Sequence, residues 1–573
     1  MYQAERLKRW LPAIVFVCFC CAYLYELTTT LSRYDRREKV INEDALGYYA
    51  ILPAYFKYND PNWTFLDTAI DNRDQYAETF PYIVNQIDQN KKVCKYYSGP
   101  ALLQLPFYFM AELSTDDDNP FSNTHHFYIL LSVVFYVVSG FFLLYRILLR
   151  WQYSPLQAGA FISFVLFGTN LFVYTAYDPA YSHAYSFFAF SAFASLLLSI
   201  KQKPTLIKFI ASGLVFGLIL IIRPLNGIVI LLAPIILYGN FISTIKKHFS
   251  SILLALIAVI IFPAIQSYLW HWQTGDWYVY PYGEEKLNLL QPQLVEFIFG
   301  YNSGWALYTP GALLMVLIGL SGLVVKKQFV RAGLSLVGIT AVLYLMSCWY
   351  YLHYGCTAGC RPITDYYGLF VLLMAYGFRE LAKNTWIRYG LLTLLSSSFI
   401  YWRIVQYQFL NHIINWCDMD QERFEMVFLK THEVYKYSTY SFWDFSTYDD
   451  QPVIGQFILK KTLQLNSKET EITLDLPTIE SNDSTLLFTF DIHSSSKNED
   501  AYLRFLITDE GEYIDQQTLL LQRKTQLSPQ IFFQFPIIKK LKKARIVIRL
   551  ETTGSEIECG AMLDRLRIQR IQL

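Results

Sequence analysis

The feature that most constrains this chain is a succession of apolar segments between residues 11 and 404, most of them long enough to cross a bilayer as a helix. Short loops rich in Lys and Arg alternate with loops that carry few basic residues, and basic loops stay in the cytoplasm. We expect about eleven transmembrane helices, over residues 11–31, 127–145, 156–176, 184–200, 206–222, 225–238, 249–270, 311–325, 332–352, 365–378 and 386–404. An odd number places the N-terminus in the cytoplasm and the C-terminus outside.

Composition supports this class of protein. Of the 573 residues, 53% are hydrophobic and only 17% are charged, and the mean hydropathy is +0.25. Soluble domains rarely combine these values, so we predict a polytopic α-helical membrane protein surrounded by membrane lipids. The net charge of +1 gives no large positive field. Nucleic acid is therefore not an expected partner.

The chain divides into three parts. Residues 1–404 form the membrane domain, with large outer loops at about 33–125 and 271–310. In the first of these loops, 99–109 is apolar but short and interrupted by Pro, so we expect a helix lying in the membrane interface. Residues 405–450 read as interfacial helices and linker. From 451 to 573, short runs of alternating polar and apolar residues predict an all-β, sandwich-like domain outside the membrane.

An acidic pair, Glu43 and Asp44, follows the first apolar segment and precedes an aromatic run. A carboxylate near the membrane surface can act as a general base on a hydroxyl group that attacks a lipid-borne substrate. Partial burial would raise the pKa of such a carboxylate and strengthen it as a base. An acidic pair at the end of a membrane helix is also the ordinary composition of a solvated helix end.

Other unusual polar residues gather in the outer loops. Positive groups there can bind the phosphate of a lipid carrier, and carboxylates or imidazoles can bind substrate or a divalent cation, Mg²⁺ or Mn²⁺. The candidates for phosphate binding are Lys95, Tyr97, Arg223 and Arg361; those for the second acidic or imidazole contribution are Asp178 and His183; those for substrate binding are Glu284, Glu285 and Asp365. A cation would use Asp44, Asp178 and His183, and the sequence does not decide between a cation and basic side chains. Charges at the ends of spans cost little, so each one alone is weak evidence.

Two cysteines, Cys356 and Cys360, flank an expected outer loop. They could form a disulfide in an oxidising compartment. A Cys-x3-Cys spacing without a matching His pair is a weak metal signal.

Several short motifs, taken in order, resemble those of the bacterial GT-C superfamily of membrane glycosyltransferases, including mannosyltransferases and aminoarabinose transferases. They are the acidic pair followed by Tyr48-Tyr49, Tyr97-Ser98-Gly99-Pro100-Ala101-Leu102-Leu103, Ser182-His183, Arg223-Pro224, Tyr308-Thr309-Pro310-Gly311 and Gly359-Cys360-Arg361-Pro362. The resemblance covers roughly residues 1–404, and its specificity lies in the order of the motifs.

The resemblance implies an enzyme of the inner (plasma) membrane that takes a sugar from a polyprenyl-phosphate carrier and transfers it to a glycan or lipid acceptor on the outer face. It assigns the catalytic role to Asp44, with Glu43 second, carrier binding to residues 95–109, and a second contribution to Asp178 and His183. The oligosaccharyltransferase branch has Asp-x-Asp in the second outer loop, whereas Asp178 stands alone, which puts metal dependence in doubt. The alternative class is a polytopic transporter or a flippase for lipids or glycans, which would favour broken helices and an internal repeat.

Overall fold

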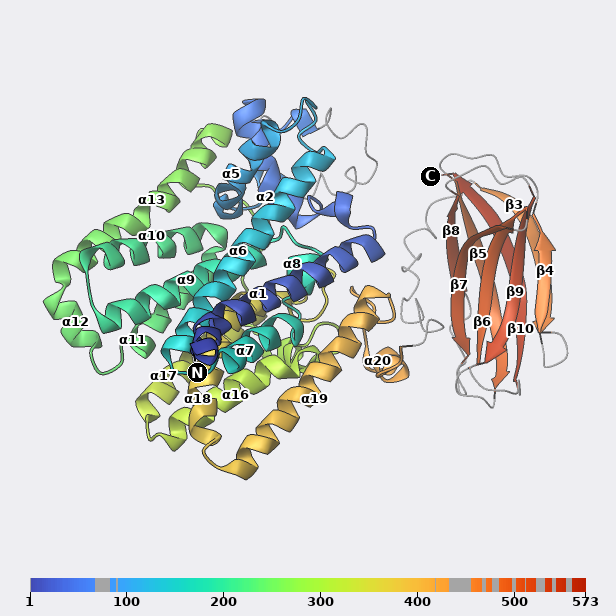
Figure 1. The fold of residues 1–573 in the computed structure, drawn as a ribbon. Helices are drawn as coiled ribbons and strands as arrows, with labels where there is room; N and C mark the ends of the chain where they lie inside the picture. The colour runs from blue at the N-terminus through green and yellow to red at the C-terminus, as the bar shows by residue number, and fades with distance from the viewer. Residues whose placement is uncertain are drawn as a thin grey trace. The chain divides into compact units, whose positions relative to one another are not determined.

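The computed structural model describes residues 2–66, 83–88, 91–417, 419–431, 455–465, 470–476, 484–496, 501–510, 512–521, 531–537, 543–552 and 559–572. The chain divides into two compact units, Met1–Gln406 and Tyr407–Leu573. The first is helical and the second is built mainly from β-strands (Figure 1). Each unit is described by itself below.

The first unit is a bundle of helices joined by short 3₁₀ and π segments. Its α-helices are α1 (Tyr2–Arg33), α2 (Asp44–Leu52), α5 (Gly99–Glu112), α6 (Asn123–Arg150), α7 (Pro155–Phe167), α8 (Val173–Ala176), α9 (Ser182–Gln202), α10 (Leu206–Ile222), α11 (Leu232–Ile236), α12 (Phe241–Lys247), α13 (Phe249–Thr274), α14 (Leu294–Phe299), α15 (Trp305–Tyr308), α16 (Pro310–Val325), α17 (Phe329–Ser347), α18 (Tyr367–Leu381) and α19 (Thr385–Leu410). The other segments are η1 (Arg37–Lys39), η2 (Pro53–Lys57), η4 (Pro224–Leu231) and η5 (Arg361–Tyr366).

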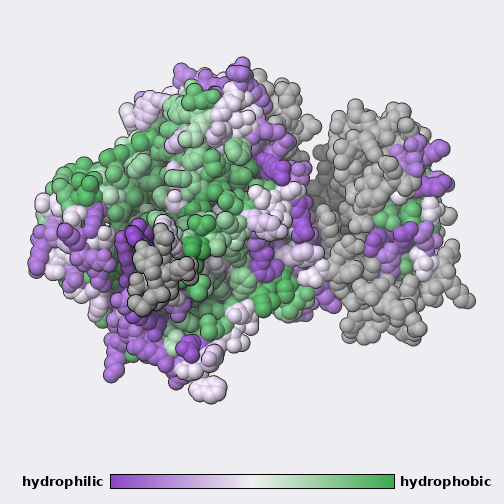
Figure 2. Space-filling model, viewed as in Figure 1, coloured by the Kyte–Doolittle hydropathy of each residue, from purple (hydrophilic) through white to green (hydrophobic). Residues whose placement is uncertain are grey.

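The helical unit has the long apolar helices of a membrane protein. Among the described residues, five helices are long and apolar enough to cross a membrane, namely the part of α1 from Arg9 together with α6, α9, α13 and α17. A sixth is reached if η4, α11 and α12, which bend by 97°, count as one span. Each of the eleven expected segments contains helix, and α7, α10 and α16 are apolar but shorter. Apolar residues cover much of the visible face of the unit (Figure 2).

Two expected spans are interrupted. The segment 156–176 consists of α7, which ends at Phe167, and the single turn α8. The segment 225–238 begins as the 3₁₀ segment η4 after Pro224 and continues into the short helix α11. Apolar composition alone does not distinguish a continuous helix from such broken ones.

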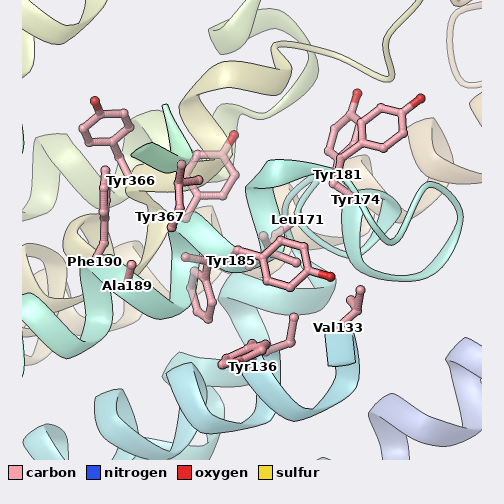
Figure 3. Close-up of a cluster of buried hydrophobic side chains, with 14 of the residues drawn as sticks. Val133, Tyr136, Leu171, Tyr174, Tyr181, Tyr185, Ala189, Phe190, Tyr366 and Tyr367 are labelled. Atoms are coloured by element: carbon pink, nitrogen blue, oxygen red, sulfur yellow. The ribbon is translucent and has the colours of Figure 1, made fainter. Parts of the chain in front are cut away.

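Small residues and aromatic rings hold the bundle together. A Cβ on Gly322 of α16 would lie 2.1 Å from the Cα of Gly377 on α18, so these helices approach as closely as backbones allow. Tyr136, Tyr185 and Phe190 belong to a buried cluster between α6 and α9, which Figure 3 shows beside Tyr366 and Tyr367. The rings of Tyr136 and Tyr185 meet edge to face with centroids 5.7 Å apart.

The long loop that follows α1 is structured where it is described. Residues 44–52 form α2, whose side chains after Asp44 are buried, and 99–112 form α5, as expected for a helix in this segment. A small hairpin of β1 (Val84–Asp88) and β2 (Lys91–Cys94) pairs Val84 with Cys94. The hairpin delivers Lys95 and Tyr96 to the region beside α2.

The second unit confirms the expected β-rich tail. Its strands are β3 (Gly455–Leu465), β4 (Glu471–Asp475), β5 (Ser484–Ser496), β6 (Ala501–Asp509), β7 (Glu512–Leu521), β8 (Ile531–Ile537), β9 (Ala544–Thr552) and β10 (Cys559–Gln572), preceded by the short helix α20 (Gln421–Val427). They form two four-stranded antiparallel sheets in the orders β3-β10-β5-β8 and β4-β9-β6-β7. This is the strand order of an eight-stranded jelly roll. Leu503, Phe505 and Ile507 alternate as buried residues on β6, as a half-buried sheet requires.

Candidate active site

The centre of the candidate site is the start of α2. Asp44 is the first residue of this helix, where exposed backbone amides favour a negative charge. Its Oδ2 lies 3.0 Å from Nη1 of Arg361, and its Oδ1 accepts a hydrogen bond of 2.6 Å from the hydroxyl of Tyr96. Both oxygens of the carboxylate are therefore held in place by residues that are distant in sequence.

These two partners reverse an expectation about the basicity of Asp44. Burial alone would raise the pKa of this carboxyl, as expected from the sequence. The guanidinium of Arg361 and the hydroxyl of Tyr96 outweigh burial and lower the pKa below its ordinary value. Asp44 is therefore ionised at neutral pH, and it is a weaker base than burial alone would make it.

Glu43 lies beside Asp44 but faces a different partner. Its carboxylate accepts a hydrogen bond from the hydroxyl of Tyr181, and the guanidinium of Arg361 stands over the ring of Tyr181 at 5.3 Å. The backbone of Glu43 has φ 48° and ψ −127°, a conformation that few residues other than Gly adopt. This turn points the two neighbouring carboxylates at Tyr181 and at Arg361 respectively.

Asp178 forms a second acidic position close to the first. It pairs with Arg36, whose Nε also donates to the carbonyl of Tyr177 at 3.0 Å. Burial, together with the charge of Glu43, raises the pKa of Asp178 to about 6 against the opposing effect of Arg36. The pair lies within electrostatic reach of Glu43, so Asp178 belongs to the same charged group.

A third cluster is organised around Asp365, which is fully buried in η5. His183 Nδ1 lies 2.7 Å from its Oδ1, and Asn226 Nδ2 donates to its Oδ2 at 2.7 Å. Arg223 Nη1 lies 3.6 Å from the same Oδ2, and that nitrogen is buried without a hydrogen-bond partner among the described residues. Nη1 of Arg223 could therefore donate a hydrogen bond to an oxygen of an anionic ligand.

The remaining candidates lie around this group, in the two long loops at about 33–125 and 271–310. Lys95 is buried and its Nζ lies 2.5 Å from Oε1 of Glu285. Its charge acts on Asp44, so it lies close to the first carboxylate. Tyr97 packs its ring against Trp270, with centroids 5.6 Å apart. Glu284 is exposed, next to Glu285.

The three residues proposed for a cation have separate partners. Asp44 pairs with Arg361, Asp178 with Arg36, and His183 with Asp365. Within the described ranges, no group of three or more His, Cys, Asp or Glu residues is arranged to hold a metal ion. Pairing with three different residues is the arrangement of a charge network rather than a shared ligand set.

Hydrogen bonds from Asn170 hold the loop that carries Arg361 in place. Asn170 Nδ2 donates to the carbonyls of Ala358 and Cys360 at 3.1 and 3.3 Å, and Gly359 between them has φ +70°. Cys360 is a free, buried cysteine, whereas Cys356 is in a disulfide, so the disulfide that the sequence left open for these two residues is not formed. Burial raises the pKa of the Cys360 thiol beyond its ordinary range, which suits a packing residue.

Four residues of the site were not predicted. Tyr96, rather than its neighbour Tyr97, contacts Asp44; Tyr181 binds Glu43; Arg36 binds Asp178; Asn226 binds Asp365. A signal existed for Arg36, which stands in the same short basic and acidic stretch as the pair Glu43 and Asp44. Nothing in the sequence distinguishes Tyr96 from Tyr97, because only the direction of the chain after β2 separates them.

No protein-family model matches this chain, and no curated protein matches it. Function is therefore inferred from the geometry of the site and from the resemblance of its motifs.

Proposed function

We propose that this protein is an integral membrane glycosyltransferase of the GT-C type. It takes a sugar from a polyprenyl-phosphate carrier and transfers it, with inversion, to a glycan or lipid acceptor on the outer face of the membrane. The observation that carries the proposal is the position of Asp44, held between Arg361 and Tyr96 beside a group of basic residues. A carboxylate and several cations at one end of a helical membrane unit are the groups that this reaction needs.

In the proposed reaction, Asp44 takes the proton of the acceptor hydroxyl while the oxygen attacks the anomeric carbon. The bond from that carbon to the carrier phosphate breaks, and the phosphate leaves with the electron pair. Arg223, whose buried Nη1 lacks a hydrogen-bond partner in the described part of the chain, and Lys95 are placed to bind it. A phosphate that also binds Arg361 would weaken the ion pair between Arg361 and Asp44. The basicity of Asp44 would then rise.

The decisive experiment compares three single variants of the full chain in vesicles. We expect Asp44→Asn to lower transfer from a polyprenyl-phosphate sugar by about 10²–10⁴, as for loss of a general base. Glu43→Gln should cost less because Tyr181, not the acceptor, is its partner. Asp116→Asn, an exposed carboxylate of the same outer loop, is the matched control and should be silent. Normal turnover by Asp44→Asn would remove the first loop from the catalytic centre. Repeating the assay with EDTA, then with Mg²⁺ or Mn²⁺, decides whether a cation assists.

The proposed orientation has about eleven spans, the N-terminus in the cytoplasm and the β-sheet unit outside. The support is the charge bias of the loops, since Lys and Arg gather at the ends of α6, α9 and α18. We expect Gln202→Cys to be labelled only from the cytoplasm, and Asp116→Cys and Lys543→Cys only from outside. Labelling of Lys543→Cys from the cytoplasm would require an even number of spans.

One observation favours a second candidate, a flippase for a lipid carrier. The segment of η4, α11 and α12 bends by 97°, and transporters use broken helices of this kind. The two functions separate in vesicles that contain a fluorescent polyprenyl phosphate and no acceptor. Movement of the lipid between leaflets that is unaffected by Asp44→Asn would favour the flippase, and its absence would favour the transferase.

A further inference from the structure

The end of the helical unit opposite the candidate site holds a pocket lined by basic residues. Helices α9 and α18 run from one to the other: His183 and Tyr367 begin them near Asp365, and Lys201 and Arg379 lie near their far ends. Because α9 has 21 residues, the two ends are about 30 Å apart, the thickness of a bilayer core. The pocket has a volume of about 630 Å³ and contains Arg150, Lys201, Lys326, Arg331 and Arg379.

The charges in this pocket are not balanced by carboxylates of its own. No Asp or Glu is among its lining residues in the described part of the chain. Lys201 Nζ donates to the carbonyl of Ile236 at 2.7 Å, and Arg331 Nε donates to the carbonyl of Ile235 at 3.1 Å. Of the five cations, Lys326 pairs with Glu380, at 2.9 Å. Several basic side chains therefore line one pocket, and most of their contacts are with neutral oxygen atoms. Such a pocket attracts an anion.

An apolar cavity adjoins the basic pocket. The two share Trp151, Leu198, Ile236, Arg331 and Tyr376, and the apolar one extends between η4, α11, α17 and α18 as far as Tyr366. Its volume is about 140 Å³, similar to a cavity that accommodates a benzene molecule, so it can take the first methylene groups of a lipid chain. An anion with an apolar tail fits this combination better than a free anion.

One buried hydroxyl marks the border between the two spaces. Ser335 lines the apolar cavity one helical turn after Arg331, is only 4% exposed, and its Oγ has no hydrogen-bond partner among the described residues. Leaving such a buried group unpaired is unfavourable, so an acceptor atom of a ligand is expected there. The ester carbonyl of a glycerophospholipid lies a short distance from its phosphate and supplies that acceptor.

We propose that this end of the protein binds an anionic glycerophospholipid. Its phosphate lies between Lys201, Arg331 and Arg379, its ester carbonyl accepts from Ser335, and the start of one acyl chain fills the apolar cavity. The preference of basic residues for the cytoplasmic side accounts for the presence of these cations. It accounts neither for their convergence on one pocket nor for the unpaired Ser335 hydroxyl.

The test is native mass spectrometry of the full chain in detergent, titrated with dioleoyl phosphatidylglycerol and with dioleoyl phosphatidylcholine. We expect the wild type to bind the anionic lipid with clear preference, and the double variant Lys201→Gln, Arg331→Gln to bind it at least about tenfold more weakly. The control is the double variant Lys246→Gln, Lys247→Gln, which removes two exposed cations of α12 that do not line the pocket. It should bind the anionic lipid as the wild type does.

Ser335→Ala keeps the test informative if the double variant does not fold. Because it removes an unpaired buried hydroxyl, we expect a higher Tm without lipid together with weaker binding of phosphatidylglycerol. Opposite changes of this kind are not expected from a merely structural serine. Three results would overturn the proposal: equal binding of phosphatidylcholine, equal loss of binding in the α12 control, or displacement of the lipid by excess inorganic phosphate. The last would identify a site for free phosphate.

Discussion

Both ends of the helical unit contain many charged side chains, but the two ends differ in how these charges are balanced. At the candidate active site four acidic residues have defined partners: Arg361 for Asp44, Tyr181 for Glu43, Arg36 for Asp178 and His183 for Asp365. At the other end, Lys and Arg side chains line an open pocket. The first arrangement is fixed before any ligand arrives, and the second is completed only by an anion.

The difference follows from burial. Asp365 and His183 lie deep in the bundle, where an unpaired charge would be very costly, so each must be matched within the protein. Lys201 and Arg379 are exposed, and solvent or a lipid headgroup can balance them. Fixed, paired charges suit a site that must orient reacting groups, whereas like charges in an open pocket suit reversible binding.

The strongest way to break this comparison is to remove the centre of the buried cluster. Asp365→Ala leaves Arg223 buried without its carboxylate and takes a partner from His183 and Asn226. We expect a loss of about 3–5 kcal/mol in the free energy of unfolding, as for other broken buried pairs. Equilibrium unfolding in mixed micelles measures it. A loss below about 1 kcal/mol would mean that this cluster is solvated and not the rigid base of the site.

The second test acts on the charge that controls Asp44. In Arg361→Met, burial becomes the main influence on Asp44, and its pKa rises. Asp44 must be ionised to accept a proton, so turnover falls as the pH drops through its pKa, and the acidic limb of the rate profile should move to higher pH. Loss of the guanidinium should also lower the rate at the optimum by roughly 10²-fold. The measurement is the pH dependence of transfer in both proteins.

An unchanged acidic limb in Arg361→Met would contradict the assignment of Asp44 as the titrating base. A lower rate with an unchanged limb would leave Arg361 as a phosphate partner only. The variant Arg146→Met is the matched control, because Arg146 is an exposed arginine of α6 whose guanidinium lies over the ring of Phe142 and which belongs to neither site.

The sequence was sufficient to predict helix in each expected apolar segment and to single out several residues that the structure pairs. Each such charge alone is weak evidence, but Asp44, Arg223, Arg361 and Asp365 all lie near the ends of the expected segments, and the structure pairs Asp44 with Arg361 and Arg223 with Asp365. The alternation of the tail likewise predicted two sheets of short strands. These features depend on composition and period, which a sequence displays directly.

The sequence could not show in which direction a side chain points or which residue it pairs with. Whether Tyr96 or Tyr97 meets Asp44 depends on the exit angle of one hairpin, and Lys95 proved to lie against Glu285, 190 residues away. The basicity of Asp44 was misjudged for the same reason, because burial could be guessed while the opposing effect of Arg361 could not. The segment 156–176 is interrupted at Gly168, which caps α7, and 225–238 begins as a 3₁₀ segment after Pro224; apolar composition alone does not reveal either break.

The smallest expected effect tests the other side of the comparison. Lys201 is exposed and donates to a single carbonyl, so Lys201→Gln in lipid-free detergent should change the free energy of unfolding by no more than about 0.5 kcal/mol. Added phosphatidylglycerol should stabilise the wild type more than the variant, because a ligand that binds only the folded state raises its stability with concentration. Unfolding measured with and without the lipid gives both numbers. A large loss without lipid would show that Lys201 is structural, like the buried charges at the opposite end, and the contrast between the two ends would fail.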